Sequence, residues 1–149
     1  MKLKEGDKAP DFTGKLHDGS TIKLSDLQGK RVVLYFYPQD DTPTCTVESC
    51  NLRDNYKLLQ KSGYEVYGIS PDNEKSHVKF RKKYNLPFPL ISDIDKSIHE
   101  LYGTWGEKQL FGRNYMGTLR TTFVIDEQGV IKEIISKVDS KNHTEQILK

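Results

Sequence analysis

The two cysteines of the chain lie five positions apart, at Cys45 and Cys50, in a segment whose residue types favour thiol chemistry. Thr42 is suited to cap a helix, and Pro43 to occupy its first position, where a missing N–H costs nothing. Cys45 then falls at about the third helical position, beside backbone N–H groups that have no partner within the helix. These groups and the positive end of the helix dipole lower the pKa of a thiol, so the sequence predicts a nucleophilic thiolate at Cys45.

The spacing of the two cysteines limits how they can react with each other. Five residues of an ideal helix correspond to a rise of about 7.5 Å and a rotation of about 140°. The Cα atoms would then be roughly 8 to 9 Å apart, beyond the ~7 Å that a disulfide can span. A disulfide between Cys45 and Cys50 therefore requires at least one helical turn to unwind. We expect Cys45 to share the core face of the helix with Leu52 and Leu59, and Cys50 to lie with Val47 on a less apolar side.

Charged residues near the cysteines set a further condition on this chemistry. Asp40, Asp41 and Glu48 carry carboxylates, which raise the pKa of a thiol that lies close to them. A cation from elsewhere in the chain must offset them, and Arg120 is the first candidate. Glu48 could also close a capping box on the start of the helix and orient an arginine.

The residues from Tyr35 to Cys50 resemble a known active-site signature. The run Tyr-Phe-Tyr-Pro-x-Asp-Asp-Thr-Pro-x-Cys-Thr-x-Glu-x-Cys is similar to that of the peroxiredoxins. The Cys-x4-Cys spacing resembles their Q-type subfamily, also called bacterioferritin comigratory proteins. Pro38, Thr42 and Cys45 match the family motif Pro-x-x-x-Thr-x-x-Cys, and Cys50 matches the resolving cysteine. The likeness extends over nearly the whole chain.

This resemblance implies a thiol peroxidase that reduces hydrogen peroxide and organic hydroperoxides in antioxidant defence. Cys45 would be oxidised to a sulfenic acid, and Cys50 would condense with it to form an intrachain disulfide. Thioredoxin or a similar dithiol protein would then reduce that disulfide. Thr42 and the backbone N–H of Cys45 would hydrogen-bond the peroxide, and Pro38 would shield the thiolate from water. Neither a metal nor an organic cofactor is implied.

Arg120 resembles the arginine that the family carries in the strand pattern Arg-Thr-Thr-Phe-Val-Ile-Asp. It would supply the permanent cation that holds the thiolate and polarises the peroxide oxygens. Arg53 and Arg113 are weaker candidates for the same role. The chain departs from the subfamily at Thr44, where members usually carry glycine. A side chain there bears on the flexibility of the helix start, and hence on rate more than on reaction class.

Several other readings of the cysteine pair stay open at this point. Cys45 could be an inert buried thiol, or the pair could belong to a redox sensor or binding module that cycles the disulfide without turnover. A thioredoxin-like disulfide oxidoreductase is disfavoured because the spacing is not Cys-x-x-Cys. A metal site is weaker still, because the histidines are dispersed and none has ligand spacing to Cys45, namely His17, His77, His99 and His143.

Length and composition indicate one soluble domain over residues 1–149. The chain is 35% hydrophobic and 30% charged, which suits a single sizeable core. Its net charge of +2 is small and its basic residues are interspersed with acidic ones, so no nucleic-acid surface is predicted. No apolar stretch approaches the ~18 residues of a membrane helix. Two cysteines without a signal peptide indicate a reducing, cytoplasmic location, and the resemblance favours a monomer.

The order of the expected elements predicts the fold class. Strands alternate with helices and a final hairpin and helix follow, which is typical of an α/β sandwich with a mixed central sheet. The resemblance implies a thioredoxin-like fold with helices on both faces and an N-terminal hairpin extension. Segment 103–117 is expected to be a loop. Strands are expected at 12–16, 21–24, 31–37, 64–70, 86–93, 119–126 and 130–135, and helical segments at 25–28, 43–62, 74–84, 96–102 and from 141.

Overall fold

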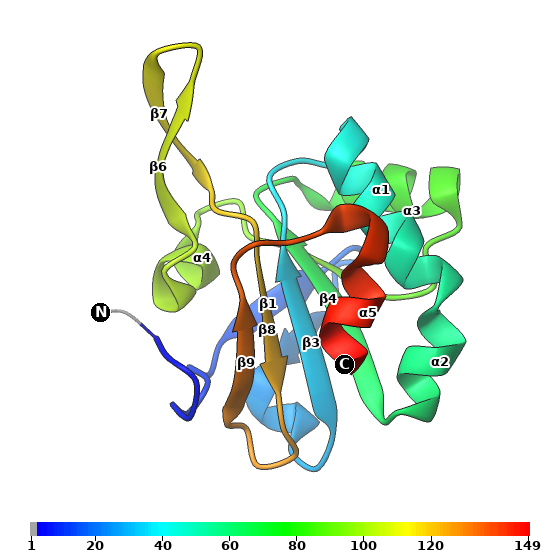
Figure 1. Ribbon diagram of the computed structural model, residues 1–149. Helices are drawn as coiled ribbons and strands as arrows, with labels where there is room; N and C mark the ends of the chain where they lie inside the picture. Colours follow the sequence, from blue (N-terminus) through cyan, green and yellow to red (C-terminus); the bar gives the residue numbers. More distant parts are fainter. Residues whose placement is uncertain (1–2) are drawn as a thin grey trace.

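The computed structural model describes residues 3–149, which form a central mixed sheet and a separate two-stranded hairpin (Figure 1). The strands are β1 (Thr13–Leu16), β2 (Thr21–Lys23), β3 (Arg31–Phe36), β4 (Tyr64–Ser70), β5 (Leu90–Ser92), β6 (Trp105–Leu110), β7 (Arg113–Thr118), β8 (Thr121–Ile125) and β9 (Ile131–Ile135). Seven of them form one sheet in the order β2-β1-β5-β4-β3-β8-β9. β4 pairs in parallel with β3 and β5, whereas β8 is antiparallel to β3 and β1 to β5. The predicted mixed α/β sheet is confirmed.

The central strand β3 shows how the sheet is buried on both faces. Val32, Leu34 and Phe36 belong to one core, while Val33 and Tyr35 belong to the other. These side chains are 1% exposed or less. A strand covered on both faces has a continuous apolar sequence rather than an alternating one. The strand predicted over 31–37 is therefore confirmed, although it ends one residue earlier than expected.

Helices cover both faces of the sheet, as expected (Figure 1). On the face of the first core lie η1 (Leu24–Leu27) and α4 (Ser97–Tyr102). The second core lies beneath α1 (Pro43–Asp54), α2 (Tyr56–Lys61), α3 (Glu74–Tyr84) and α5 (His143–Leu148), and the short η2 (Ser140–Asn142) leads into α5. Within residues 3–149, none of these helices has the length and apolar character needed to cross a membrane.

The single helix expected over 43–62 is divided into α1 and α2. The break falls at Asn55, whose φ of −111° and ψ of 13° depart from helical values. The Asn55 side-chain amide donates to the carbonyl of Asn51, the same carbonyl that accepts from the Asn55 backbone N–H. Asparagine side chains compete with helix hydrogen bonds in this way, so the kink has a local cause. Gly63 follows with a φ of +85°, as predicted for a helix C-terminus.

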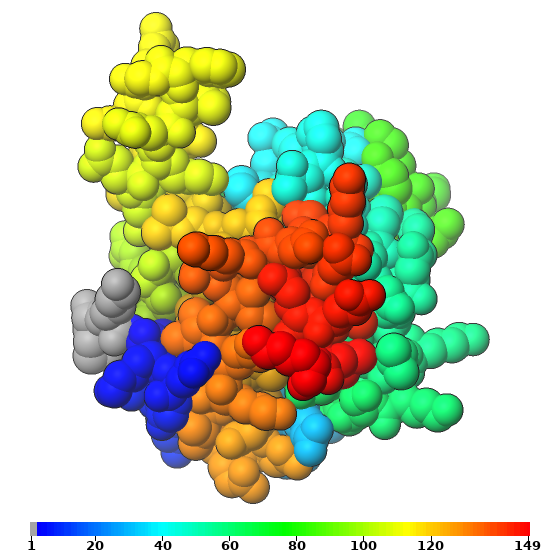
Figure 2. All heavy atoms as spheres, viewed as in Figure 1, coloured from blue at the N-terminus to red at the C-terminus, as the bar shows by residue number. Residues whose placement is uncertain are grey.

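The expectation of a loop over 103–117 is wrong, because this segment forms the β6–β7 hairpin. Six residue pairs join the two strands in antiparallel register, from Trp105 with Thr118 to Leu110 with Arg113. The hairpin projects away from the body of the molecule (Figures 1 and 2). Its tip residue Phe111 is 97% exposed. A projecting hairpin lacks the buried face that gives a strand its apolar pattern, which explains why the sequence resembles a loop.

Candidate active site

Cys45 lies at the third residue of α1, as its place after Thr42 and Pro43 predicts. Its side chain is 1% exposed and belongs to the second core together with Leu52 and Leu59. Cys45 and Cys50 are both free thiols in an intact helix. The arrangement thus places a buried but unbonded sulfur atom at the N-terminal end of α1, where partial positive charge accumulates.

Arg120 supplies the cation that the sequence requires near Cys45. Its side chain extends from the residue before β8, and Nη2 donates a hydrogen bond to the Sγ of Cys45 at 3.1 Å. Nη1 donates to Oε1 of Glu48 at 2.5 Å. Desolvation lowers the pKa of Arg120, but the negative charges of Glu48 and Cys45 outweigh it, so the net direction is upward. The guanidinium therefore remains charged and is shared between the sulfur and a carboxylate.

Thr42 is the N-terminal cap of α1 by its backbone, with a φ of −93° and a ψ of 156°, but its side chain does not cap the helix. Its hydroxyl donates instead to the carbonyl of Gln39 at 2.9 Å. The first N–H to bond within the helix is that of Thr46, which donates to the carbonyl of Thr42. The amide of Cys45 precedes it and so has no carbonyl of the helix to bond. Pro38, which is half-buried, follows the end of β3.

The prediction of a capping box at Glu48 is wrong, whereas the expectation that Glu48 orients an arginine is confirmed. Glu48 lies in the second turn of α1, is 0% exposed and contacts Arg120 rather than the helix start. Burial raises its pKa to about 7, against the opposing effect of Arg120. Its second oxygen, Oε2, has no hydrogen-bond partner within residues 3–149. Nε2 of His143 lies 3.5 Å from this oxygen.

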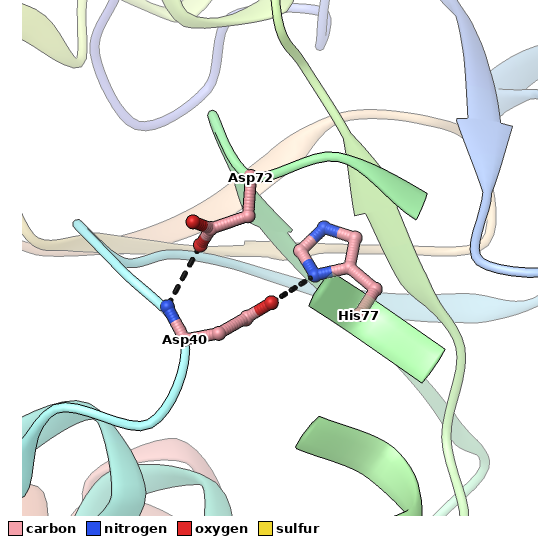
Figure 3. A group of neighbouring side chains, drawn as sticks. All are labelled: Asp40, Asp72 and His77. Carbon is pink, nitrogen blue, oxygen red and sulfur yellow. Dashed lines mark hydrogen bonds and ion pairs between the residues drawn. The ribbon is translucent and has the colours of Figure 1, made fainter. Parts of the chain in front are cut away.

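The other two carboxylates near the cysteines are held by α3. Oδ2 of Asp40 accepts hydrogen bonds from Ser76 and from Nδ1 of His77, and Oδ1 accepts from Tyr37. The backbone N–H of Asp40 donates to Asp72 (Figure 3). Asp40, Asp72 and His77 lie close enough together to hold a metal ion. Their facing atoms are already joined by hydrogen bonds, so we interpret the cluster as the attachment of the active-site loop to α3.

Asp41 is attached to the same helix at its far end. It accepts hydrogen bonds from Nζ of Lys83 and from the hydroxyl of Tyr84, both at 2.8 Å. These bonds lower the pKa of Asp41, with Lys83 as the largest cause. Asp40 and Asp41 therefore have partners of their own, whereas Glu48 shares the guanidinium of Arg120 with Cys45.

Over most of its length the chain is similar to proteins of one family. Residues 5–134 match the model of the AhpC/TSA family. A putative peroxiredoxin bcp of Coxiella burnetii is 48% identical over 148 residues, which cover 99% of this chain and 98% of that protein. The peroxiredoxin Bcp of Bacillus subtilis is 43% identical, covering 99% and 94% respectively. The chain belongs to the AhpC/TSA family.

A solved structure supports the same conclusion at the level of the fold. The bacterioferritin comigratory protein of Xanthomonas campestris superposes with a TM-score of 0.86 at 31% identity, covering 92% of this chain and 87% of that one. This peroxiredoxin therefore has the thioredoxin-like fold that the sequence predicts, and it is a thiol peroxidase of the Bcp or Q-type group.

In this peroxiredoxin, Cys50 lies on the outer side of α1, as its spacing predicts. It is half-buried, and burial raises the pKa of its thiol while Arg53 opposes that effect. Val47, on the same side, is 40% exposed. Arg53 itself bonds Asp54 and the carbonyl of Tyr84. It is therefore engaged away from Cys45.

The second weaker candidate, Arg113, is also separated from the site. It lies exposed at the start of β7, near the tip of the projecting hairpin (Figure 1). Among the three arginines that the sequence proposes, Arg120 alone has a hydrogen bond to Cys45 in the described chain.

Two buried residues of the site have no counterpart in the sequence prediction. His143 begins α5 and is 0% exposed. Tyr35 of β3 shares a hydrogen bond of 2.9 Å with Ser49 of α1, which fixes the helix against the sheet. The contact of His143 with Glu48 and that of Tyr35 with Ser49 each join two different elements of the fold. The only signal for Ser49 is its place four residues after Cys45, on the same face of the helix.

Proposed function

We propose that Cys45 is the peroxidatic cysteine of this peroxiredoxin, that Cys50 resolves the oxidised form and that thioredoxin restores the dithiol. The single observation that carries the assignment is the 3.1 Å hydrogen bond from Nη2 of Arg120 to Sγ of Cys45. A permanent cation at this distance stabilises negative charge on the sulfur. The helix start adds its partial positive charge in the same direction.

The proposed reaction begins with attack of the Cys45 thiolate on one oxygen of a hydroperoxide. The S–O bond forms with two electrons from sulfur while the O–O bond breaks, and the second oxygen leaves as hydroxide or alkoxide. The hydrogen of the attacked oxygen stays on the resulting sulfenic acid. The leaving oxygen takes a proton from water, giving water or an alcohol. The residues around sulfur must therefore stabilise negative charge that moves from sulfur to oxygen.

Three neighbours of Cys45 are suited to that task. Arg120 can follow the charge from sulfur to the peroxide oxygens, because its guanidinium offers several donors in one plane. The amide of Cys45 and the hydroxyl of Thr42 are the polar groups of the helix start closest to it in sequence. The hydroxyl oxygen of Thr42 has free lone pairs while its O–H donates to Gln39, so it can accept a hydrogen bond from the peroxide. Pro38 adds an apolar wall without an N–H group.

The second step joins Cys45 and Cys50 and needs part of α1 to unwind. The sulfenic acid oxygen leaves as water when the Cys50 thiol attacks sulfur, so the disulfide forms without another oxidant. The moving segment has an anchor at each end. Asp41 is bonded to Lys83, and Asn51 is bonded to the carbonyl of Lys141. We propose that residues between these anchors rearrange while α3 and α5 stay in place.

A partly apolar hollow beside Arg120 supports organic hydroperoxides as substrates, in addition to hydrogen peroxide. Arg120 and Lys108 contribute its positive charge, and Tyr102, Leu119 and Phe123 contribute apolar surface. The Xanthomonas campestris relative is described in terms of alkyl peroxide reduction. An alkyl group could lie in this hollow while the peroxide reaches the guanidinium.

Thioredoxin, or a protein with a similar dithiol, is the proposed reductant of the disulfide. A dithiol is required because reduction by exchange passes through a mixed disulfide that a second thiol must release. We further propose that the protein works as a monomer in the cytoplasm, where its cysteines are kept reduced between turnovers.

The experiment that tests these roles compares two cysteine variants with the wild type. Cys45→Ser should lose peroxide consumption altogether. Cys50→Ser should consume one equivalent of peroxide and then stop in a thioredoxin-coupled assay. Mass spectrometry of the wild type after one equivalent should find an intrachain link between the two residues. Turnover by Cys50→Ser at the wild-type rate with thioredoxin would contradict the resolving role of Cys50. Oxidation of Cys45 no faster than that of free cysteine would contradict its peroxidatic role and favour a redox sensor.

A further inference from the structure

Glu48 and His143 meet at the back of the site in a contact that lacks a proton. Oε2 of Glu48 lies 3.5 Å from Nε2 of His143, and both side chains are 0% exposed. Oε2 has no other partner within the part of the chain that the structure describes. A buried carboxylate oxygen without a partner is strongly unfavourable, so this contact calls for a donor between the two atoms.

The neighbours of His143 fix which of its nitrogens carries hydrogen when the ring is neutral. Nδ1 lies 2.7 Å from Oε1 of Gln146, and the Gln146 amide nitrogen donates to the carbonyl of Lys137. Oε1 of Gln146 is therefore an acceptor, and Nδ1 must be the donor. Nε2 is then a lone pair that accepts from the hydroxyl of Thr122 at 2.7 Å. In this state Glu48 and His143 face each other with acceptors only.

One added proton resolves the contact, whichever of the two residues carries it. A protonated Glu48 donates from Oε2 to Nε2 in place of the Thr122 hydroxyl, and a protonated His143 donates from Nε2 to the carboxylate. Burial raises the pKa of Glu48 to about 7 and lowers that of His143, and both directions favour the proton on Glu48. Either way, the pair as a whole becomes neutral.

We propose that Glu48 and His143 bind a single proton as a buried pair, and that this proton controls how much of the charge of Arg120 is available to Cys45. When Glu48 carries the proton, the guanidinium has one anionic partner, the thiolate. When the proton is lost, the ionised Glu48 competes with the sulfur for the same cation. His143 is thus a positioning residue that acts through Glu48 and Arg120. The consequence for catalysis rests on the proposed role of Cys45, whereas the shared proton does not.

The other charged and titratable groups around the pair leave this assignment intact. Tyr35 faces Glu48 from β3, and burial raises its pKa well above the usual value, so it stays neutral. Asp139, before η2, acts on His143 from a distance, with a smaller effect than burial. Lys108 of β6 donates to the carbonyl of Thr118 rather than to Glu48, and burial and Arg120 lower its pKa. Arg120 is therefore the one cation in direct contact with Glu48 within residues 3–149.

Two substitutions lock the pair in opposite states. Glu48→Gln is the isostere of the protonated acid, because its amide can donate to Nε2 of His143 while its carbonyl accepts from Arg120. His143→Gln places an amide donor permanently opposite Oε2, so Glu48 can remain ionised without a proton. His17→Gln is the matched control, since it removes a half-buried histidine of the β1–β2 turn whose pKa burial also lowers.

The kinetic test measures single-turnover oxidation of Cys45 by hydrogen peroxide from pH 6 to pH 8, in a Cys50→Ser background. The rate is divided by the thiolate fraction obtained from ultraviolet absorbance. We expect the resulting rate constant to fall by about tenfold across this range when Glu48 and His143 are intact, as a change of one pKa unit corresponds to a factor of ten. His17→Gln should follow the same curve. The rate constants of Glu48→Gln and His143→Gln should each be independent of pH, and that of Glu48→Gln should be about tenfold larger than that of His143→Gln.

A spectroscopic test reads the proton itself and is independent of the peroxidase reaction. At pH 6 the infrared spectrum should contain the C=O stretch of a buried protonated carboxyl group, absent from Glu48→Gln, or the nitrogen resonances of His143 should be those of an imidazolium. A site with neither signal would overturn the proposal. A rate constant that still falls with rising pH in Glu48→Gln would also overturn it. So would equal losses of rate constant in Glu48→Gln and His143→Gln. If Cys45→Ser retained peroxidase activity, the proposed function would fail while the infrared signal remained.

Discussion

Arg120 is the residue on which the chemistry of the site depends, because one guanidinium serves two anions. It contacts Cys45 and Glu48 through different nitrogens, and its side chain is 19% exposed. Electrostatic interactions are stronger at such partly buried positions than in water. A lysine has a single charged nitrogen on a flexible stem and cannot reproduce this two-sided contact.

Arg120→Lys should therefore keep the charge and still impair the reaction. We expect the second-order rate constant for hydrogen peroxide to fall by about 10²-fold, the usual loss on removal of one preorganised donor. The thiolate fraction of Cys45 at pH 7, measured by ultraviolet absorbance, should also fall. Arg113→Lys, an exposed position on β7, is the control and should change neither quantity. Wild-type kinetics in Arg120→Lys would show that the two-sided contact is dispensable.

The residues of the site divide clearly into those that the sequence predicts and those that it does not. Cys45, Cys50 and Thr42 form a local pattern of turn, cap and helix start, so their order along the chain is sufficient. Arg120 is far away in sequence and was found through its family pattern. His143 has neither advantage, because its role arises only when α5 packs against α1, and no short pattern encodes that contact.

Helix α1 makes more hydrogen bonds to neighbouring elements in its C-terminal half than at its start. Asn51 donates to the carbonyl of Lys141 and accepts from both the backbone N–H and the hydroxyl of Thr144. The N–H of Thr144 belongs to the first turn of α5, so Asn51 caps that helix from outside. Thr44 and Pro43, at the start of α1, are exposed. These differences define which end of α1 can unwind.

Asn51→Ala should loosen the boundary of the unwinding segment. Loss of three hydrogen bonds at a half-buried position should lower the free energy of unfolding by about 1–3 kcal/mol. The same change should speed formation of the Cys45–Cys50 disulfide after oxidation, because the intact helix that keeps the thiols apart becomes easier to open. Quenched samples analysed by mass spectrometry would give this rate.

The control for that experiment is Asn55→Ala. Asn55 also bonds with its side chain, but to the carbonyl of Asn51 within the same helical segment, and not to α5. It should leave the rate of disulfide formation close to that of the wild type. A slower reaction in Asn51→Ala would mean that the anchor assists closure rather than restrains it.

The predicted strands and helices are confirmed where a buried face gives the sequence a recognisable apolar pattern. The central strand β3 is predicted because its apolar residues form a continuous run, and the helix over 74–84 because a turn and the capping residue Asn73 precede it. The β6–β7 hairpin and the break between α1 and α2 were missed. The first has little buried surface, and the second depends on one asparagine side chain that bonds the backbone.

The two cores of the molecule differ in their position relative to the active site. The first core, beneath α4 and η1, is closed by apolar and aromatic side chains such as Phe36, Tyr102 and Phe123. The second core contains Cys45 and lies against the buried polar residues Glu48 and His143. Burial raises the pKa of Glu48 to about 7, so Glu48 changes its protonation within the range of ordinary pH. The stability of the fold is therefore linked to the same proton that we assign to the site.

Glu48 should make the folded protein less stable as the pH rises. Its folded pKa of about 7 lies above the ordinary value of 4.5, so the folded state binds the proton more tightly than the unfolded chain. Its contribution is complete below pH 4.5 and is lost as the pH rises to about 7, which corresponds to about 3 kcal/mol at most. The lowered pKa of His143 acts in the opposite direction, because its contribution is lost on acidification below its ordinary value of 6.5.

Glu48→Gln removes the first of these contributions and leaves the second. Urea denaturation of the variant and the wild type between pH 4.5 and pH 8 isolates it, since the difference between their free energies of unfolding should move in favour of the variant as the pH rises. Glu107→Gln, at an exposed position of β6, should give a difference that is constant with pH. Parallel curves for Glu48→Gln and the wild type would mean that Glu48 is ionised in the folded protein throughout, because only a carboxylate that takes up its proton in this range can produce the slope.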